Sequence, residues 1–130
     1  MSRYKALSAF FMGISIIGLF GPWLFFAHSV DYRTGIQSQP GIMFVGYTLF
    51  FIFIYLKGEE AYIRVTTTIG AGMVVIGCIY DFLTWHIMTI TGEFNLRVSF
   101  STAHDGFYLT FITSIISLII YTYGCITKKL

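Results

Sequence analysis

Long apolar runs, separated by short polar segments, are the feature that most constrains the fold of this 130-residue chain. Hydrophobic residues make up 56% of the chain and charged residues 11%, whereas a soluble domain is typically about 25% charged. Folding in water would leave too much apolar surface exposed, so we predict that the lipid bilayer is the solvent. The net charge of +2, without a run of Lys or Arg, excludes a nucleic-acid partner.

We predict an all-α membrane protein, a single domain built as a bundle of four transmembrane helices. The helices are expected over residues 6–27, 41–56, 65–90 and 107–126. The first run extends about 33 Å at 1.5 Å per residue, enough to cross a hydrocarbon core of about 30 Å. Pro22 is expected to kink or end this helix, and Trp23 suits the membrane interface. The run is too long for a signal peptide and has no Ala-x-Ala cleavage site, so we expect it to be retained.

The basic residues indicate how the chain is oriented in the membrane. One set of helix ends carries Arg3, Lys5, Lys57, Arg64, Lys128 and Lys129, and the other set carries Arg33 and Arg97. Cytoplasmic loops are enriched in Lys and Arg. We therefore predict a plasma or inner membrane protein with both termini and loop 57–64 in the cytoplasm, and with loops 28–40 and 91–106 outside.

The two outer loops carry a pattern typical of β-structure. Residues 93–102 alternate strictly between polar and apolar, which is the period of a half-buried strand. Residues 26–33 alternate less cleanly, Thr34-Gly35 follows as a turn, and residues 36–39 return as a second strand. An isolated hairpin is marginal in water. We therefore predict a small antiparallel sheet on the outer face, formed by both loops.

A Gly-Pro-Trp sequence, Gly21 to Trp23, ends the first predicted helix. Together with a β-rich first loop, a compact cytoplasmic turn and a strand before helix four, it resembles the claudin-like four-helix layout. The chain is also similar to short prokaryotic four-span proteins with Pro-Trp at the end of helix one. The claudin first-loop signature of tryptophans and paired cysteines is absent, so tight-junction function is not implied. The resemblance implies the four-helix fold and a scaffold or partner-binding role.

Asp81 is the carboxylate that lies well inside a predicted span. A charge at the bilayer centre costs about 2.5–3.5 kcal/mol on insertion scales, so such a residue is a functional candidate. Asp81 would act as a proton carrier, an ion ligand or half of a salt bridge. Alternatively, it hydrogen-bonds Tyr, Thr or Ser on adjacent helices and locks the bundle.

The three histidines all lie toward the outer side. His28, His86 and His104, with Asp105, would form a Zn²⁺ or Cu site if their elements converge, and two histidines would also suffice for haem. The spacing is not a recognised metal motif, and the default expectation is no cofactor. In the alternative interpretation these are ordinary interfacial polar residues, with Asp105 as the N-cap of helix four.

Small residues on two helices predict close packing. Thr110, Ser114 and Ser117 fall on one face of helix four, and Gly70 and Gly77 on one face of helix three. Small and hydroxyl residues allow membrane helices to approach and hydrogen-bond. We expect these two helices to pack together, although a polar stripe of this kind could also line a translocation path.

Standard catalytic motifs are absent, and helix two is rich in aromatic residues. The predicted strand has one apolar face, formed by Phe94, Leu96, Val98 and Phe100, which needs cover from the first loop, the bilayer or a partner. We therefore predict a non-enzymatic accessory or assembly subunit that contacts membrane lipid and larger membrane proteins or copies of itself. The alternatives are a metal- or haem-binding membrane protein, a small transporter or channel, and a toxin-immunity protein.

Overall fold

The computed structural model describes residues 2–25, 32–38, 41–57, 60–86, 93 and 95–130. Within these residues the chain forms helices and one small antiparallel sheet. In chain order the elements are α1 (Arg3–Gly18), β1 (Pro22–Phe25), β2 (Tyr32–Thr34), α2 (Gly35–Ser38), α3 (Gly41–Tyr55), α4 (Ala61–His86), α5 (Leu96–Thr102) and α6 (Asp105–Ile126). The chain is therefore mostly helical, as its composition predicts.

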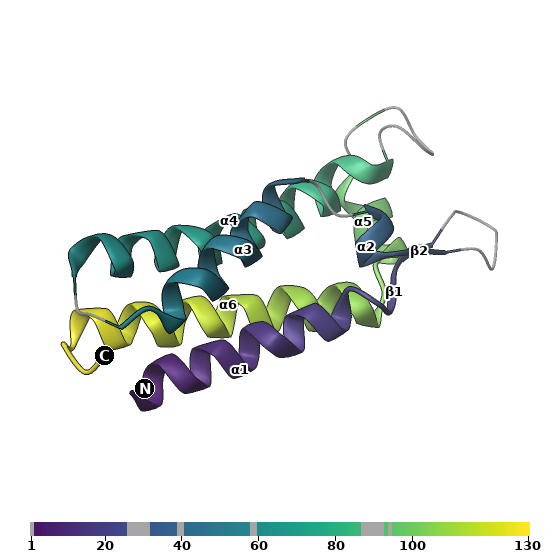
Figure 1. Cartoon of the computed structure of the whole chain (residues 1–130). Helices are drawn as coiled ribbons and strands as arrows, with labels where there is room; N and C mark the ends of the chain where they lie inside the picture. The colour runs from purple at the N-terminus through teal and green to yellow at the C-terminus, as the bar shows by residue number, and fades with distance from the viewer. Residues whose placement is uncertain (1, 26–31, 39–40, 58–59, 87–92, 94) are drawn as a thin grey trace.

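The four long helices lie side by side as two pairs (Figure 1). α1 packs along α6, and α3 packs along α4, while contacts between α4 and α6 join the pairs. Both termini and the α3–α4 connection lie at one end of the molecule, which we call the terminal end. β1, β2, α2 and α5 lie at the other, which we call the hairpin end.

Glycines set how closely the helices in each pair approach. A Cβ at Gly70 of α4 would lie 2.6 Å from the backbone nitrogen of Phe50 on α3. In the other pair, a Cβ at Gly106 of α6 would lie 2.9 Å from the carbonyl oxygen of Gly18 on α1. Real side chains cannot occupy such space, so only glycine allows these backbones to come so near.

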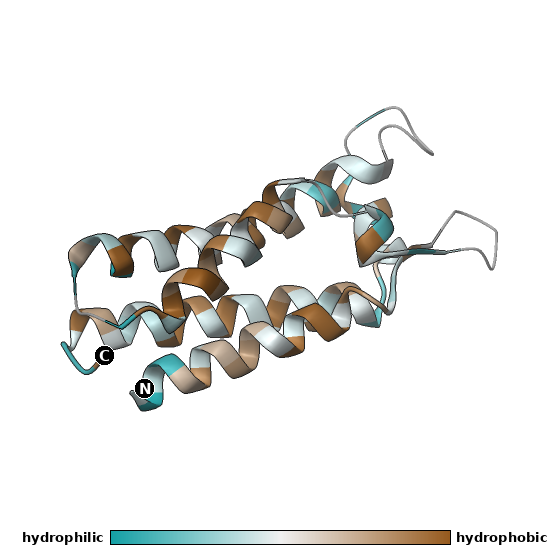
Figure 2. Ribbon diagram, viewed as in Figure 1, coloured by the Kyte–Doolittle hydropathy of each residue, from teal (hydrophilic) through white to brown (hydrophobic). Residues whose placement is uncertain are grey.

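Two of the helices have the dimensions of membrane spans. α4, over Ala61–Trp85, and α6, over Asp105–Ile126, are each long and apolar enough to cross a membrane. α3 is a shorter apolar helix of 15 residues. Figure 2 shows hydrophobic residues recurring along all the long helices, with the strongly hydrophilic ones mostly toward their ends.

The first helix is shorter than the predicted range of 6–27. α1 ends at Gly18, and β1 begins at Pro22. Leu19 and Gly21 donate backbone hydrogen bonds to Ile16 and Gly18 as the chain turns, and Pro22 has no amide hydrogen with which to continue the helix. The apolar residues that follow form the strand β1, which is buried at Trp23 and Leu24.

The predicted sheet is present at the hairpin end, but the first loop alone supplies its strands. β1 and β2 pair antiparallel, with Leu24 opposite Arg33 and Phe25 opposite Tyr32. The predicted return strand over 36–39 is wrong, because α2 covers Gly35–Ser38. There Thr34 and Gln37 bond reciprocally, each side chain to the other's backbone amide, at 3.1 and 3.4 Å. This is the capping-box arrangement that begins a helix.

The predicted strand over 93–102 is also wrong, because Leu96–Thr102 forms the helix α5. The Asn95 side chain caps it by accepting hydrogen bonds from the amides of Arg97 and Val98, at 3.0 and 3.3 Å. The third loop supplies no strand to the sheet among the described residues, and it pairs with β1 at an isolated bridge between Leu24 and Ala103. Beside it, the His104 amide donates to the Trp23 carbonyl oxygen at 2.8 Å.

The remaining helices follow the predicted ranges closely at most ends. α3 spans Gly41–Tyr55 against the predicted 41–56, and α6 spans Asp105–Ile126 against 107–126. α4 begins at Ala61, four residues before the predicted start, and is described as far as His86. Residues 87–90 of the predicted third helix lie outside the described residues.

Candidate functional site

The hydroxyl residues of α6 are buried against α1. Ser8 and Ser117 place their hydroxyl oxygens 2.9 Å apart, and each hydroxyl also lies within hydrogen-bond distance of the other residue's backbone carbonyl. The Thr110 hydroxyl donates to the Ser15 carbonyl oxygen at 2.9 Å, and Ser114 donates within α6 to the carbonyl oxygen of Phe111. The stripe therefore joins α6 to α1, where the sequence pointed to α4.

The glycine face of α4 contacts α3. Gly70 approaches the backbone of Phe50, and a Cβ at Gly77 would meet the side chain of Met43. The two small-residue faces predicted to meet each other therefore serve different pairs. The polar stripe makes its contacts within the α1–α6 pair, and the glycine face makes its contacts within the α3–α4 pair. Other residues therefore form the interface between the two pairs, which we call the seam.

Asp81 lies in this seam, toward the hairpin end of α4. It is buried to 8% exposure, and its Oδ2 atom accepts no hydrogen bond from any residue that the structure describes. Arg33 on β2 exerts an electrostatic attraction on this carboxylate, beyond the 4.0 Å of a direct ion pair. Among the described residues, the basic side chain whose charge acts on Asp81 thus comes from the hairpin.

Cys78 and Tyr47 are further buried residues with polar side-chain atoms in the interior. Cys78 lies one turn before Asp81 on α4, is fully buried and is not in a disulfide. The buried Tyr47 of α3 places its hydroxyl 2.9 Å from the Ser15 Oγ on α1. The Ser15 hydroxyl also reaches the Met12 carbonyl oxygen at 2.7 Å. The Tyr47–Ser15 hydrogen bond thus joins α3 to α1 inside the bundle.

The structure describes only part of the predicted histidine site. His28 lies outside the described residues, and His86 is the last residue of α4, without a described side chain. His104 is partly exposed, and its Nδ1 lies 3.9 Å from Asp105 Oδ2. The described residues contain no group of three or more His, Cys, Asp or Glu placed to hold a metal ion. Asp105 is the first residue of α6, and His104 is the N-cap, which corrects the predicted capping role of Asp105.

The apolar residues of the third loop lie differently from the predicted strand face. Leu96 and Phe100 are one turn apart on α5 and are 47% and 61% exposed. Val98 is half-buried, and Phe94 lies outside the described residues. The Phe100 ring contacts Phe82 of α4 edge to face, with centroids 5.0 Å apart. We call Leu96 and Phe100 the α5 apolar face.

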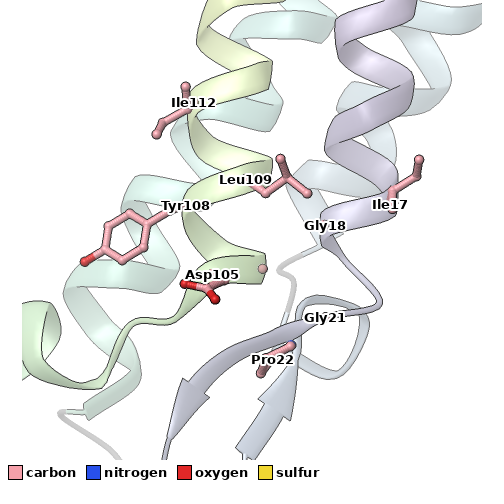
Figure 3. A pocket seen from close by; sticks show the side chains of 9 residues that line it. Ile17, Gly18, Gly21, Pro22, Asp105, Tyr108, Leu109 and Ile112 are labelled. Carbon is pink, nitrogen blue, oxygen red and sulfur yellow. The ribbon is translucent and has the colours of Figure 1, made fainter.

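A groove opens on the surface between the end of α1 and the start of α6 (Figure 3). Its volume is about 590 Å³, and it is lined mainly by aliphatic residues and Tyr108, with Asp105 at the end where α6 begins. This groove was not predicted from the sequence, because it forms only where the chain leaves α1 for β1 and returns as α6. The Gly-x-x-Gly-Pro sequence from Gly18 to Pro22 was its available signal.

The site candidates are thus a buried seam around Asp81, the α5 apolar face and the α1–α6 groove. The seam can hold a proton or stabilise the pairing of the helices. The α5 apolar face and the groove are surfaces for binding. Comparison of the chain with protein-family models, with curated proteins and with solved structures finds no match.

Proposed function

We propose that this chain is an integral membrane protein whose α1, α3, α4 and α6 each cross the bilayer. We further propose that it is a non-enzymatic accessory or assembly subunit of a larger membrane complex. α4 and α6 have the length of spans. α1 and α3 have 16 and 15 residues and extend about 24 and 22 Å, so they require local thinning of the bilayer or a partner beside them.

The distribution of polarity supports this placement. Hydroxyl side chains fill part of the interior, as Ser8, Ser15 and Ser117 are completely buried. Large apolar side chains face outward, including Phe10 of α1, Ile119 of α6 and Ile52 of α3. Exposed apolar surface on a monomer in water is rarely extensive. Exposing these side chains to water costs free energy, whereas in a bilayer lipid chains solvate them without that cost.

The charge distribution supports cytoplasmic termini. The terminal end carries Arg3, Lys5, Lys57, Arg64, Lys128 and Lys129, and the hairpin end carries Arg33 and Arg97. Basic residues close to the ends of spans favour the cytoplasmic side. The hairpin end therefore faces outward, in the periplasm or the extracellular space.

The α5 apolar face is the observation that carries the partner-binding role. α5 directly precedes α6, whose 22 residues extend about 33 Å and fill the hydrocarbon thickness by themselves. Leu96 and Phe100 therefore project at or beyond the membrane surface, where lipid chains cannot fully cover them. An exposed aromatic and aliphatic pair on a short rigid helix has the character of an interface anchor.

Single lysine substitutions on α5 test this role in the host membrane. We expect Leu96→Lys and Phe100→Lys each to reduce co-purification of larger membrane subunits at least about tenfold, the effect of losing one interface anchor. Ser101→Lys places the same charge at an exposed polar position of α5 and serves as the matched control. Unchanged co-purification of both apolar-face variants would exclude α5 as the interface.

Asp81 favours a second candidate function, ion or proton movement across the membrane. Its carboxylate on α4 is buried, with Oδ2 accepting no hydrogen bond from the described residues, which is the environment of a group that could take up a proton or an ion. This function predicts ion flux into liposomes that falls in Asp81→Asn. Equal flux for liposomes with the wild-type protein and for empty liposomes would eliminate it.

A further inference from the structure

We propose that the groove between α1 and α6 holds one acyl chain of a phospholipid with an ammonium headgroup, and that Asp105 binds the ammonium. This inference rests on the membrane placement proposed above. It adds a defined ligand class, represented by phosphatidylethanolamine, to a surface that the partner-binding role does not use. Figure 3 shows Ile17 and Leu109 on the two helices, with Asp105 and Pro22 at the end where α6 begins.

The groove has the size and surface of a lipid-chain site. Its volume of about 590 Å³ lies within the range of about 300–1,000 Å³ that small-molecule sites occupy. Ile17, Leu109 and Ile112 line it and are exposed. These aliphatic side chains, together with the ring of Tyr108, give the groove a mainly apolar wall that matches the chemistry of an acyl chain.

The position of charge in the groove matches the polarity of a phospholipid. Asp105 begins α6, and Ile112 lies about 10 Å further along the helix at 1.5 Å per residue. With the hairpin end outward, the carboxylate stands at the headgroup level and the aliphatic walls extend below it into the hydrocarbon.

The Asp105 side chain is 95% exposed, so its charge is open to a ligand from the bilayer. Its recorded neighbour, His104 Nδ1, is 3.9 Å away, at the outer limit of ion pairing. A carboxylate here attracts the ammonium of an ethanolamine headgroup and repels an anionic headgroup such as glycerol phosphate. The charge therefore selects among lipids that share the same chains.

A lipid fits this groove better than a partner helix does. Helices associate closely in membranes where small residues present a flat surface. Gly18 and Gly106 are already occupied by the contact between α1 and α6, because a Cβ on Gly106 would meet the Gly18 carbonyl oxygen at 2.9 Å. The open groove combines the side chains of Ile17, Tyr108, Leu109 and Ile112 with the glycine backbone between them, an uneven surface that a flexible chain can follow.

Native mass spectrometry of the full chain tests this inference. The protein is purified in detergent with equimolar phosphatidylethanolamine and phosphatidylglycerol of identical chains, and the bound lipid is weighed. We expect the ethanolamine lipid to exceed the glycerol lipid about fivefold, the ratio expected of one charge interaction near the membrane surface. Asp105→Asn should bring the ratio close to one, and Leu109→Trp should remove the bound lipid by filling the groove.

Ile69→Trp, at an exposed apolar position on α4 outside the groove, is the control and should retain the wild-type ratio. Equal retention of both lipids by the wild type, or a ratio that Asp105→Asn leaves unchanged, would overturn the inference. A co-purifying polypeptide that Leu109→Trp displaces, without any lipid adduct, would assign the groove to a partner helix instead. Release of the protein from membranes by alkaline carbonate would refute the membrane placement itself, which is a separate outcome.

Discussion

The Tyr47 hydroxyl on α3 lies 2.9 Å from the Ser15 Oγ on α1, and this hydrogen bond joins the two helix pairs across their seam. Both residues are buried. Ser15 keeps a second partner, the Met12 carbonyl oxygen, so removing the tyrosine hydroxyl breaks one bond and leaves the serine satisfied. The seam thus offers a clean test of how strongly the pairs are held together.

Tyr47→Phe should lower the free energy of unfolding by about 0.6–1.7 kcal/mol, the range measured for interhelical hydrogen bonds in membrane proteins. The measurement is equilibrium unfolding in mixed micelles, followed by circular dichroism. Tyr55→Phe, at a 61% exposed position near the end of the same helix, should change stability by only a few tenths of a kcal/mol. Equal effects of the two substitutions would show that the Ser15 contact contributes nothing.

Gly106→Ala should weaken the contact between α1 and α6. Its Cβ would lie 2.9 Å from the Gly18 carbonyl oxygen of α1, so the two backbones must separate, at a cost of about 1–3 kcal/mol for overpacking. Gly72→Ala on α4 is the control, since nothing lies within 4 Å of its Cβ position. That substitution should be neutral or stabilise the helix by up to about 1 kcal/mol. A neutral Gly106→Ala would contradict the close approach.

Arg33 and Asp81 should be energetically coupled. Arg33→Gln leaves the buried carboxylate without the cation that attracts it, and should therefore destabilise the wild type more than it destabilises Asp81→Asn. A double-mutant cycle on unfolding stability should give a coupling energy of about 0.5–3 kcal/mol. If the two substitutions add without coupling, the hairpin is not held to α4 through this pair.

Labelling with a membrane-impermeant maleimide tests the orientation. In a background with Cys78→Ala and Cys125→Ala, Ser101→Cys on α5 should be labelled in intact cells or spheroplasts. Glu60→Cys and Lys129→Cys, both exposed at the terminal end, should be labelled only after the membrane is permeabilised. The reverse pattern would invert the topology, and labelling of all three in intact cells would exclude the four-span arrangement.

The ranges of α3 and α6 were predictable, because long apolar runs are bounded by Pro40, by Lys57 and by the polar residues around position 105. The end of α1 was not. Hydropathy continues through Pro22, Trp23 and Leu24, and it does not distinguish an apolar helix from an apolar strand. The pairing of Leu24 with Arg33, which makes this segment a strand, depends on residues beyond the run.

The alternation over 93–102 was misleading for a related reason. Most of this alternating stretch folds as the short helix α5 and not as a strand. The Asn95 side chain caps the start of that helix. At the site, the burial of Asp81 was predictable from its depth in an apolar run. Its relation to Arg33 was not, because sequence proximity says nothing about a contact made by the folded hairpin. The contact of Ser117 with Ser8 of α1 could not be predicted for the same reason.

Native mass spectrometry of the protein, extracted gently from its host membrane, tests the proposed function most directly. The accessory role predicts stoichiometric complexes with larger membrane subunits. Lysine at Leu96 or Phe100 should dissolve these complexes, and lysine at Ser101 should leave them intact. Recovery of the wild-type chain alone, or only as a homo-oligomer, would contradict the accessory role.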